Sequence, residues 1–202
     1  MKLIKPFSPT IGITKIPKSI VFNINQEFEK VIKNKYLYKK YNYSKKLVGQ
    51  VQQEIELSNS FLDKYLKKFI ITKVNTYLKK TLNKKSKKIK IKNLWVVSQF
   101  KNEYNPIHFH NGDISGVGYL KIPKNLTKGK KKIKTNGTID FIHGSKSFLN
   151  NSIYNHVPKV ADLILFPNYL MHAVYPFKQE GERRSFSFNI EVDKKISNIF
   201  ND

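Results

Sequence analysis

Hydrophobic residues recur with two different periods along this chain. From Ser58 the segment SNSFLDKYLKKFIITKVNTYLKKTL places its apolar residues three and four positions apart, with lysines mainly on the opposite side. This spacing predicts a long amphipathic helix that covers a sheet. From Lys90 onward apolar and polar residues alternate, which is typical of β-strands.

Proline, glycine and asparagine divide the alternating part into short segments. The predicted strands are residues 90–100, 115–122, 137–142, 161–166, 171–176 and 184–192. Many short strands after one helical layer predict a mostly β protein with flanking helices, built as a small barrel or sandwich. The lysine-rich segment 124–137 is expected to be an exposed hairpin loop.

The first part of the chain is patterned less regularly. Residues 2–7 and 18–24 are proline-punctuated apolar pieces that predict short edge strands, and Asn25 is the expected cap of a short helix ending near Tyr36. Residues 37–57, rich in tyrosine and lysine, predict a loop that lines a cavity. We expect one domain over 1–202, with 1–89 as a helical and edge-strand buttress and 90–192 as the β core.

The amino-acid composition limits the kinds of site that this chain can form. Apolar residues make up 40% of the chain and aromatic residues 13%, which is enough for a buried core. There is no cysteine, so a metal would have to be held by histidine, aspartate or glutamate. No apolar run approaches the roughly 20 residues that span a bilayer, and the start does not resemble a signal peptide. We therefore expect a soluble cytoplasmic protein, in the host cytoplasm for a phage-encoded chain.

The net charge of +24 raises the question of an anionic partner. Apart from Arg183 and Arg184 every basic residue is lysine, accompanied by abundant asparagine and isoleucine, a pattern typical of AT-rich coding. We interpret the charge first as a solvated lysine surface. Nucleic-acid binding stays an alternative, with the lysine-rich first half and the tyrosines of residues 36–43 as its surface.

Candidate chemistry begins in HFHNGDISGVGYL, residues 108–120. His108 and His110 are two apart, so on a strand their side chains point to the same side, where two imidazoles can bind one metal ion. His172 follows a Pro-Asn turn in ADLILFPNYLMHAVYPF and can complete one face of an octahedron. Two solvated loop histidines are the alternative for the H-x-H pair alone. His143 and His156 lack partners at ligand spacing and are expected to be structural or substrate-facing.

The segment ERRSFSFNIEV alternates between polar and apolar residues from Ser185 onward. Its apolar side is expected to pack into the core and its polar side to face a cavity; the polar side holds Arg183, Ser185, Ser187, Asn189 and Glu191. An arginine beside a serine is a good clamp for a carboxylate. Arginine in a chain that otherwise uses lysine indicates a bidentate contact, with a surface pair as the alternative.

The spacing His172, ten residues, Arg183, one residue, Ser185 resembles the iron(II)- and 2-oxoglutarate-dependent oxygenases. The blocks HFHNGDISGVGYL, DLILFPNYLMHAVYPF and GERRSFSFNI occur in the same order as in an uncharacterised bacterial and phage branch of that superfamily. The resemblance covers about residues 90–192. It implies a double-stranded β-helix, or jelly roll, with helices against one sheet.

The resemblance also implies roles for individual residues. His108, His110 and His172 would bind Fe(II), while Arg183 and Ser185 would hold the far carboxylate of 2-oxoglutarate. By position Tyr119 would also reach that carboxylate, with a core aromatic as its alternative. Turnover would consume dioxygen and 2-oxoglutarate, release succinate and carbon dioxide, and hydroxylate a substrate that the sequence does not name.

The chain departs from the family at one ligand. Most members carry H-x-D, and His110 stands where that aspartate would be, so either three histidines bind the metal or Asp113 supplies a carboxylate. Strand parity favours the three histidines. Three other functions stay open: a cupin-like metal enzyme that does not use 2-oxoglutarate, a metal-free binding module, and a nucleic-acid-binding protein.

Overall fold

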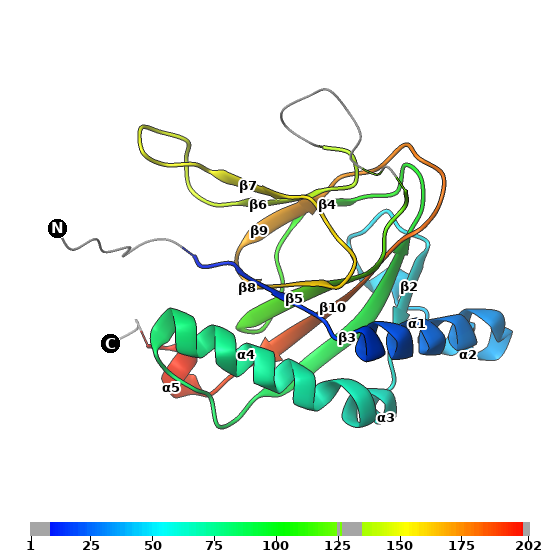
Figure 1. The fold of residues 1–202 in the computed structure, drawn as a ribbon, viewed down its shortest axis with the longest axis horizontal. Helices are drawn as coiled ribbons and strands as arrows, with labels where there is room; N and C mark the ends of the chain where they lie inside the picture. The colour runs from blue at the N-terminus through cyan, green and yellow to red at the C-terminus, as the bar shows by residue number, and fades with distance from the viewer. Residues whose placement is uncertain (1–8, 125, 127–134, 200–202) are drawn as a thin grey trace.

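Two antiparallel sheets face each other in the computed structural model, which describes residues 9–124, 126 and 135–199 (Figure 1). The larger sheet has the strand order β1-β8-β5-β10-β3-β2 and the smaller one β4-β9-β6-β7. The strands are β1 Gly12–Lys15, β2 Gln53–Glu56, β3 Lys90–Gln99, β4 Asn105–His108, β5 Ile114–Lys121, β6 Ile139–Ile142, β7 Ile153–His156, β8 Asp162–Pro167, β9 Met171–Val174 and β10 Arg183–Glu191.

The eight strands from β3 to β10 pass between the sheets in a regular order. β3, β5, β8 and β10 belong to the larger sheet, whereas β4, β9 and the β6–β7 hairpin belong to the smaller one. This order is that of a double-stranded β-helix, so the predicted fold is confirmed. β1 and β2 come from the first part of the chain and extend the larger sheet at its two edges.

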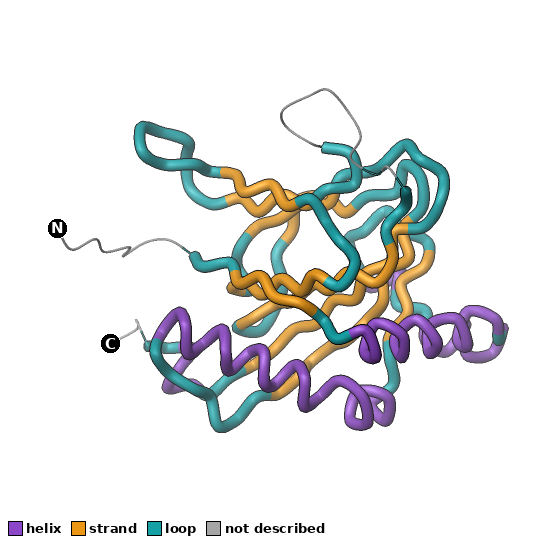
Figure 2. Tube along the Cα trace, in the orientation of Figure 1, coloured by secondary structure: helices purple, strands orange, loops and turns teal. Residues whose placement is uncertain are grey.

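The helices cover the outer face of the larger sheet (Figure 2). They are α1 Lys18–Lys33, α2 Lys35–Tyr41, α3 Asn59–Phe61, the π-helical turn η2 Leu62–Leu66, α4 Lys67–Leu82 and α5 Lys194–Ser197, whereas the short helical turn η1 Ser44–Lys46 borders the space between the sheets. The amphipathic helix predicted from Ser58 is confirmed as the run α3–η2–α4. It begins where the Ser58 hydroxyl accepts a hydrogen bond from the Phe61 N–H at 3.2 Å. Among the described residues, none of the helices combines the length and apolar character needed to cross a membrane.

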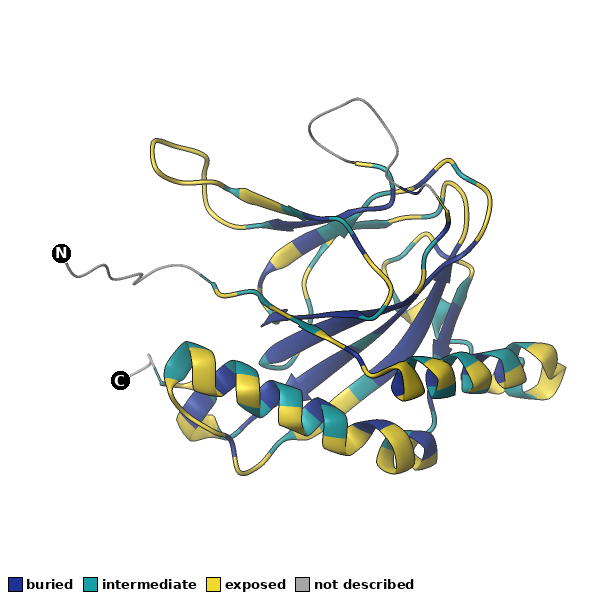
Figure 3. Ribbon diagram, viewed as in Figure 1, coloured by how far each residue is buried: buried dark blue, intermediate teal, exposed yellow. Residues whose placement is uncertain are grey.

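Two hydrophobic layers result from this arrangement (Figure 3). The larger cluster lies between the helices and the larger sheet and includes Ile24, Phe28, Ile70, Val74, Phe186 and Phe188. The smaller cluster lies between the two sheets and includes Val117, Tyr119, Ile139, Phe141, Ile164 and Phe166. Alternate residues of β5 and β10 therefore belong to different layers, as their alternating sequence predicts.

Two glycines of β5 make room for the phenyl rings of β10. Gly116 pairs with Phe188 and Gly118 with Phe186 across the strands. A Cβ at either glycine would lie 2.2 Å from the facing ring. The two glycines thus leave this face of β5 bare, so that the two phenyl rings can pack closely against it.

Three expectations for the first part of the chain are wrong. Residues 18–24 are helical, because Ile20, Ile24 and Phe28 recur every four residues and pack on the sheet. Asn25 lies inside α1 and caps nothing. Residues 37–57 are not simply a loop, since they contain most of α2, as well as η1 and β2. Residues 2–7 and most of the 124–137 loop lie outside the described residues.

All six predicted strands of the β core are present, each within three residues of its expected ends. The prediction omitted β4 and β7. β4 is the short segment that carries His108, and β7 contains exposed isoleucine and tyrosine rather than a clear alternation. Both belong to the smaller sheet, where one face is partly open to solvent.

Candidate metal centre

Three histidines converge between the sheets. His108 on β4 and His172 on β9 are paired across the strands, and His110 follows β4 in the next loop. The potential ligand nitrogens of the three residues all lie within 4.8 Å of one another. The structure therefore brings together the three histidines that the sequence singles out, at a separation that one metal ion can bridge.

Backbone contacts orient two of these imidazoles. Nδ1 of His108 lies 2.8 Å from the carbonyl oxygen of Pro106, and Nδ1 of His172 lies 2.9 Å from that of Leu170. A carbonyl oxygen can only accept, so each Nδ1 donates its proton and Nε2 keeps a lone pair. Metal-binding histidines are commonly fixed in this way.

The loop that carries His110 is held by Asn168, in the Pro-Asn turn before β9. The His110 N–H donates to the Asn168 carbonyl at 3.0 Å, and the Asn168 side-chain amide donates to the His110 carbonyl at 2.9 Å. The His110 ring lies edge-on to Trp95, with centroids 5.9 Å apart. The turn before β9 thus holds the backbone of His110, and Trp95 on β3 packs against its ring.

Burial keeps the cluster uncharged. It lowers the pKa of His110 to about 4 and that of His172 to about 3, with the neighbouring histidines adding to the effect. Burial also lowers the pKa of His108. At neutral pH the three rings are therefore neutral and can offer lone pairs to a cation without first losing a proton.

Asp113 is directed elsewhere. Its carboxylate accepts a hydrogen bond from the Val192 N–H at 2.8 Å, and its own N–H donates to the Ile190 carbonyl. The residue joins the end of β10 to the loop before β5. The geometry thus supports His110 rather than Asp113 as the middle member of the cluster.

The histidines open onto a cavity of about 660 Å³ between the sheets. The polar face of β10 forms one wall, with Arg183, Ser185, Ser187 and Asn189. Glu191 does not continue this wall, because a register shift after Asn189 moves it to the surface, where it pairs with Lys92. The prediction that the polar side of this strand faces a cavity is confirmed, apart from Glu191.

Arg183 is the most unusual residue of this wall. Its side chain is 2% exposed, and its Nη1 donates to the Gln99 side-chain oxygen at 2.7 Å. Its Nε has no partner, and no carboxylate within the described residues pairs with the guanidinium. A positive charge without a counter-charge is therefore buried beside the cavity.

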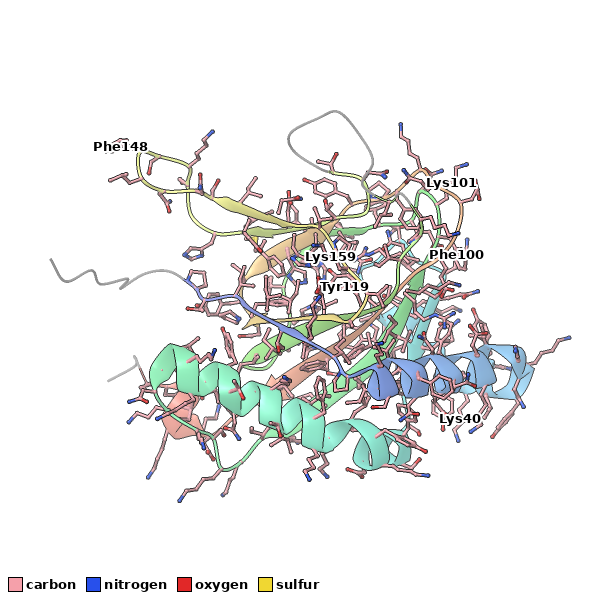
Figure 4. All side chains as sticks on the ribbon, viewed as in Figure 1. Lys40, Phe100, Lys101, Tyr119, Phe148 and Lys159 are labelled. Atoms are coloured by element: carbon pink, nitrogen blue, oxygen red, sulfur yellow. The ribbon has the colours of Figure 1, made fainter. Side chains whose placement is uncertain are left out.

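Tyr119 lies next to this charge in the interior of the molecule (Figure 4). The guanidinium carbon of Arg183 is 5.3 Å from the Tyr119 ring centroid. Across the strands Tyr119 pairs with Ser185. The buried Tyr119 hydroxyl has no partner with hydrogen-bond geometry among the described residues, and burial raises its pKa. The Tyr119 hydroxyl and the Arg183 guanidinium thus both have N–H or O–H donors that are free to bind a ligand.

Arg184 contrasts with its neighbour. It points to the helical side, where Nη2 contacts Glu182 at 2.8 Å and Glu29 at 2.7 Å. Its guanidinium also lies 4.2 Å from the Phe28 ring centroid. The two adjacent arginines therefore differ in kind: Arg184 joins α1 to the sheet, and Arg183 is left without a counter-charge.

The remaining histidines differ from each other. His143 is exposed, whereas His156 is buried, with Nε2 3.2 Å from Asp162.

Sequence reasoning missed Gln99, Trp95 and Glu54, which line the cavity as well. Alternation along β3 could have located Trp95 and Gln99, which share one face of that strand, whereas Glu54 reaches the cavity face only through the pairing of β2 with β3. The expectation that residues 37–57 line a cavity is confirmed for several residues between Tyr43 and Glu54.

Comparison with known proteins adds independent findings. Residues 93–189 match the family described as "Putative 2OG-Fe(II) oxygenase". None of the curated proteins compared with the chain matches it.

Solved structures share the fold at low identity. A prolyl-4-hydroxylase from Pseudomonas putida is 13% identical, with a TM-score of 0.62 over 91% of this chain and 92% of that one. The viral collagen prolyl hydroxylase from Paramecium Bursaria Chlorella virus-1, as its 2OG complex, is 16% identical, with a TM-score of 0.56 over 91% and 96%. HygX from Streptomyces hygroscopicus, with nickel and 2-oxoglutarate bound, is 9% identical, with a TM-score of 0.59 over 91% and 83%.

The family match begins in β3 and ends in β10, so it spans all three histidines and the buried arginine. The family uses Fe(II), 2-oxoglutarate and dioxygen. The histidine cluster suits a divalent metal and the uncompensated guanidinium suits a diacid, so the residues present fit both groups. Over residues 93–189, which hold the three histidines and Arg183, this chain matches the iron(II)- and 2-oxoglutarate-dependent oxygenases.

Proposed function

We propose that this oxygenase is a hydroxylase. It would convert 2-oxoglutarate and dioxygen to succinate and carbon dioxide while one oxygen atom enters a C–H bond of a second substrate. The observation that carries this proposal is the buried Arg183 charge, which lacks a carboxylate partner among the described residues. Because an unpaired charge in the interior is costly, the site favours an anionic ligand.

His108, His110 and His172 would hold the iron through their imidazole nitrogens. When bound, iron supplies the redox chemistry that couples decarboxylation of 2-oxoglutarate to hydroxylation. The chain contributes three neutral ligands, so it leaves the full positive charge of the metal available to the 2-oxoglutarate dianion.

Arg183 would bind the far carboxylate of 2-oxoglutarate, with help from the hydroxyls of Ser185 and Tyr119. Gln99 orients the guanidinium through its side-chain oxygen. The cavity wall nearby is apolar, with Val117, Ile139 and Phe166, which excludes water and strengthens the ionic contact. A cupin-like enzyme that did not use 2-oxoglutarate would have no need for this buried guanidinium.

The test is iron-dependent formation of succinate from 2-oxoglutarate by the purified protein, together with binding of Ni(II) as an inert probe. His172→Ala is expected to lose both. His143→Ala, which removes an exposed histidine, is the matched control and is expected to retain both. Succinate formation without added iron, or undiminished nickel binding by His172→Ala, would exclude this assignment.

A further inference from the structure

A second uncompensated group lies in the same cavity. Glu54 is on β2, at the edge of the larger sheet beside β3 (Figure 1). It pairs with Val97 across the strands, and both residues line the cavity, whereas Ile55 packs toward the helices. The Glu54 side chain therefore belongs to the wall of the active-site cavity and not to the helical core.

The Glu54 carboxyl group is completely buried and unpartnered. The residue is 0% exposed, and neither carboxyl oxygen has a hydrogen-bond partner among the described residues. Burial, with a smaller effect of Glu103, raises its pKa to about 8. The chain has many lysines, but Lys46, which also lines the cavity, has its Nζ 4.9 Å from the Tyr43 ring centroid. Among the described residues, no cationic side chain donates a hydrogen bond to either Glu54 oxygen.

A third unsatisfied acceptor lies on the adjoining segment. The side-chain oxygen of Asn105, at the start of β4, is buried without a partner and also lines the cavity. The Gln50 N–H donates to the Tyr104 carbonyl at 2.8 Å, and the Gln52 N–H donates to the Glu103 carboxylate at 3.2 Å. These contacts tie the segment before β2 to the segment before Asn105, so the acceptors lie on the same side of the cavity.

The co-substrate cannot be the ligand of these acceptors. 2-Oxoglutarate carries two carboxylates, which suit the guanidinium of Arg183 and which Glu54 would repel once it has lost its proton. The acceptors need a donor, and an ammonium group supplies three N–H donors and a positive charge. An inward-pointing acid can also protect an edge strand from pairing with other chains, but that role needs no cavity.

We propose that Glu54, assisted by Asn105, binds a protonated amine of the second substrate; this inference rests on the function proposed above. The substrate class is thus a primary amine that carries the C–H bond to be hydroxylated. Glu54 acts as a specificity-determining residue, and the cavity separates the two charges, with Arg183 for the diacid and Glu54 for the amine.

The test uses the nickel- and 2-oxoglutarate-loaded protein, in which no turnover occurs. n-Butylamine, L-lysine and spermidine are titrated calorimetrically beside their N-acetylated derivatives, in which acetylation removes the positive charge. At least one amine is expected to bind about 10- to 100-fold more tightly than its acetylated form. Glu54→Gln is expected to abolish this preference, and Glu56→Gln, on the same strand, to retain it.

Proton release is a second readout, which a purely structural role would not change. Because burial raises the pKa of Glu54 to about 8, its carboxyl group is protonated at pH 6.5, and binding an ammonium there should release close to one proton, measured in buffers of different ionisation enthalpy. Glu54→Gln should release none. Equal binding of acetylated probes, or a preference that survives in Glu54→Gln, would overturn the proposal.

Succinate formation by the wild-type protein without any amine reports on the proposed function alone. If succinate forms while no amine is preferred, the amine site is refuted and the oxygenase function stands. If no succinate forms but Glu54-dependent amine binding is observed, the oxygenase function fails and the binding site stands.

Discussion

Replacing Arg183 and Arg184 in turn should separate ligand binding from stability. Arg183→Met removes a buried charge that has no carboxylate partner among the described residues. The substitution leaves only the Gln99 side-chain oxygen without its hydrogen-bond donor. In Arg184→Met the buried Glu182 loses its closest counter-charge. The two adjacent substitutions are chemically identical, so any difference between them comes from their surroundings.

The expected magnitudes are different. Arg183→Met should weaken 2-oxoglutarate binding by about 3 kcal/mol, on the order of 100-fold, as charge-assisted hydrogen bonds are lost. Its free energy of unfolding without ligand should change by at most about 1 kcal/mol, because the unpaired charge itself costs stability. Arg184→Met should lose about 3–5 kcal/mol of stability, or roughly 10 °C in Tm.

The assay is thermal unfolding of the nickel-loaded protein with and without 2-oxoglutarate. The wild type and Arg184→Met should both gain Tm with increasing ligand, since a ligand that binds only the folded state stabilises it. Arg183→Met should show almost no gain. If Arg183→Met unfolds as readily as Arg184→Met and still responds to 2-oxoglutarate, Arg183 is structural and the argument from its unpaired charge is wrong.

Three other predictions follow from the structure. His110→Asp should bind Fe(II) more tightly than the wild type, whereas His110→Ala should bind it at least about tenfold more weakly, as measured by metal titration; equal affinities would mean that His110 is not a ligand. Gly118→Ala should lower the free energy of unfolding by about 1–3 kcal/mol in urea, because the added Cβ would lie 2.2 Å from the Phe186 ring; an unchanged midpoint would show that the ring moves aside. Since burial raises the pKa of Glu54 from 4.5 to about 8, the native state keeps a proton that the unfolded state has lost between these values. Wild-type stability relative to Glu54→Gln should therefore be greatest below pH 4.5 and fall by about 1.4 kcal/mol per unit up to pH 8; a rise with pH would contradict the assignment.

The sequence predicts the β core well because its strands alternate, and alternation fixes which side chains share a face. The polar face of β10 was predictable on this basis up to Asn189, where a register shift that leaves no mark in the sequence turns Glu191 away. The helix α1 was not predictable from its β-branched start, since Ile20 and Val21 suit a strand as well as a helix. Contacts with the sheet decide its conformation.

The residues of the candidate site also fall into those that the sequence predicts and those that it does not. Spacing and parity brought out the three histidines and the arginine clamp, because they lie on strands or directly after turns. Glu54 was not predictable, since in the sequence QQEIEL it resembles any solvated acid. Its burial depends on pairing with Val97 of β3, more than 40 residues later in the chain, and only that pairing brings it to the cavity wall.

The two edge strands have a consequence for how this enzyme could change. The family match covers residues 93–189, whereas β2 and the segment leading into it come earlier in the chain and still form part of the cavity wall. The proposed ligands of the metal and of 2-oxoglutarate thus lie within the matched stretch, whereas Glu54, the main group of the proposed amine site, lies before it. Exchanging residues 43–56 for another sequence offers a way to redirect the enzyme to new substrates while its oxidative machinery stays intact.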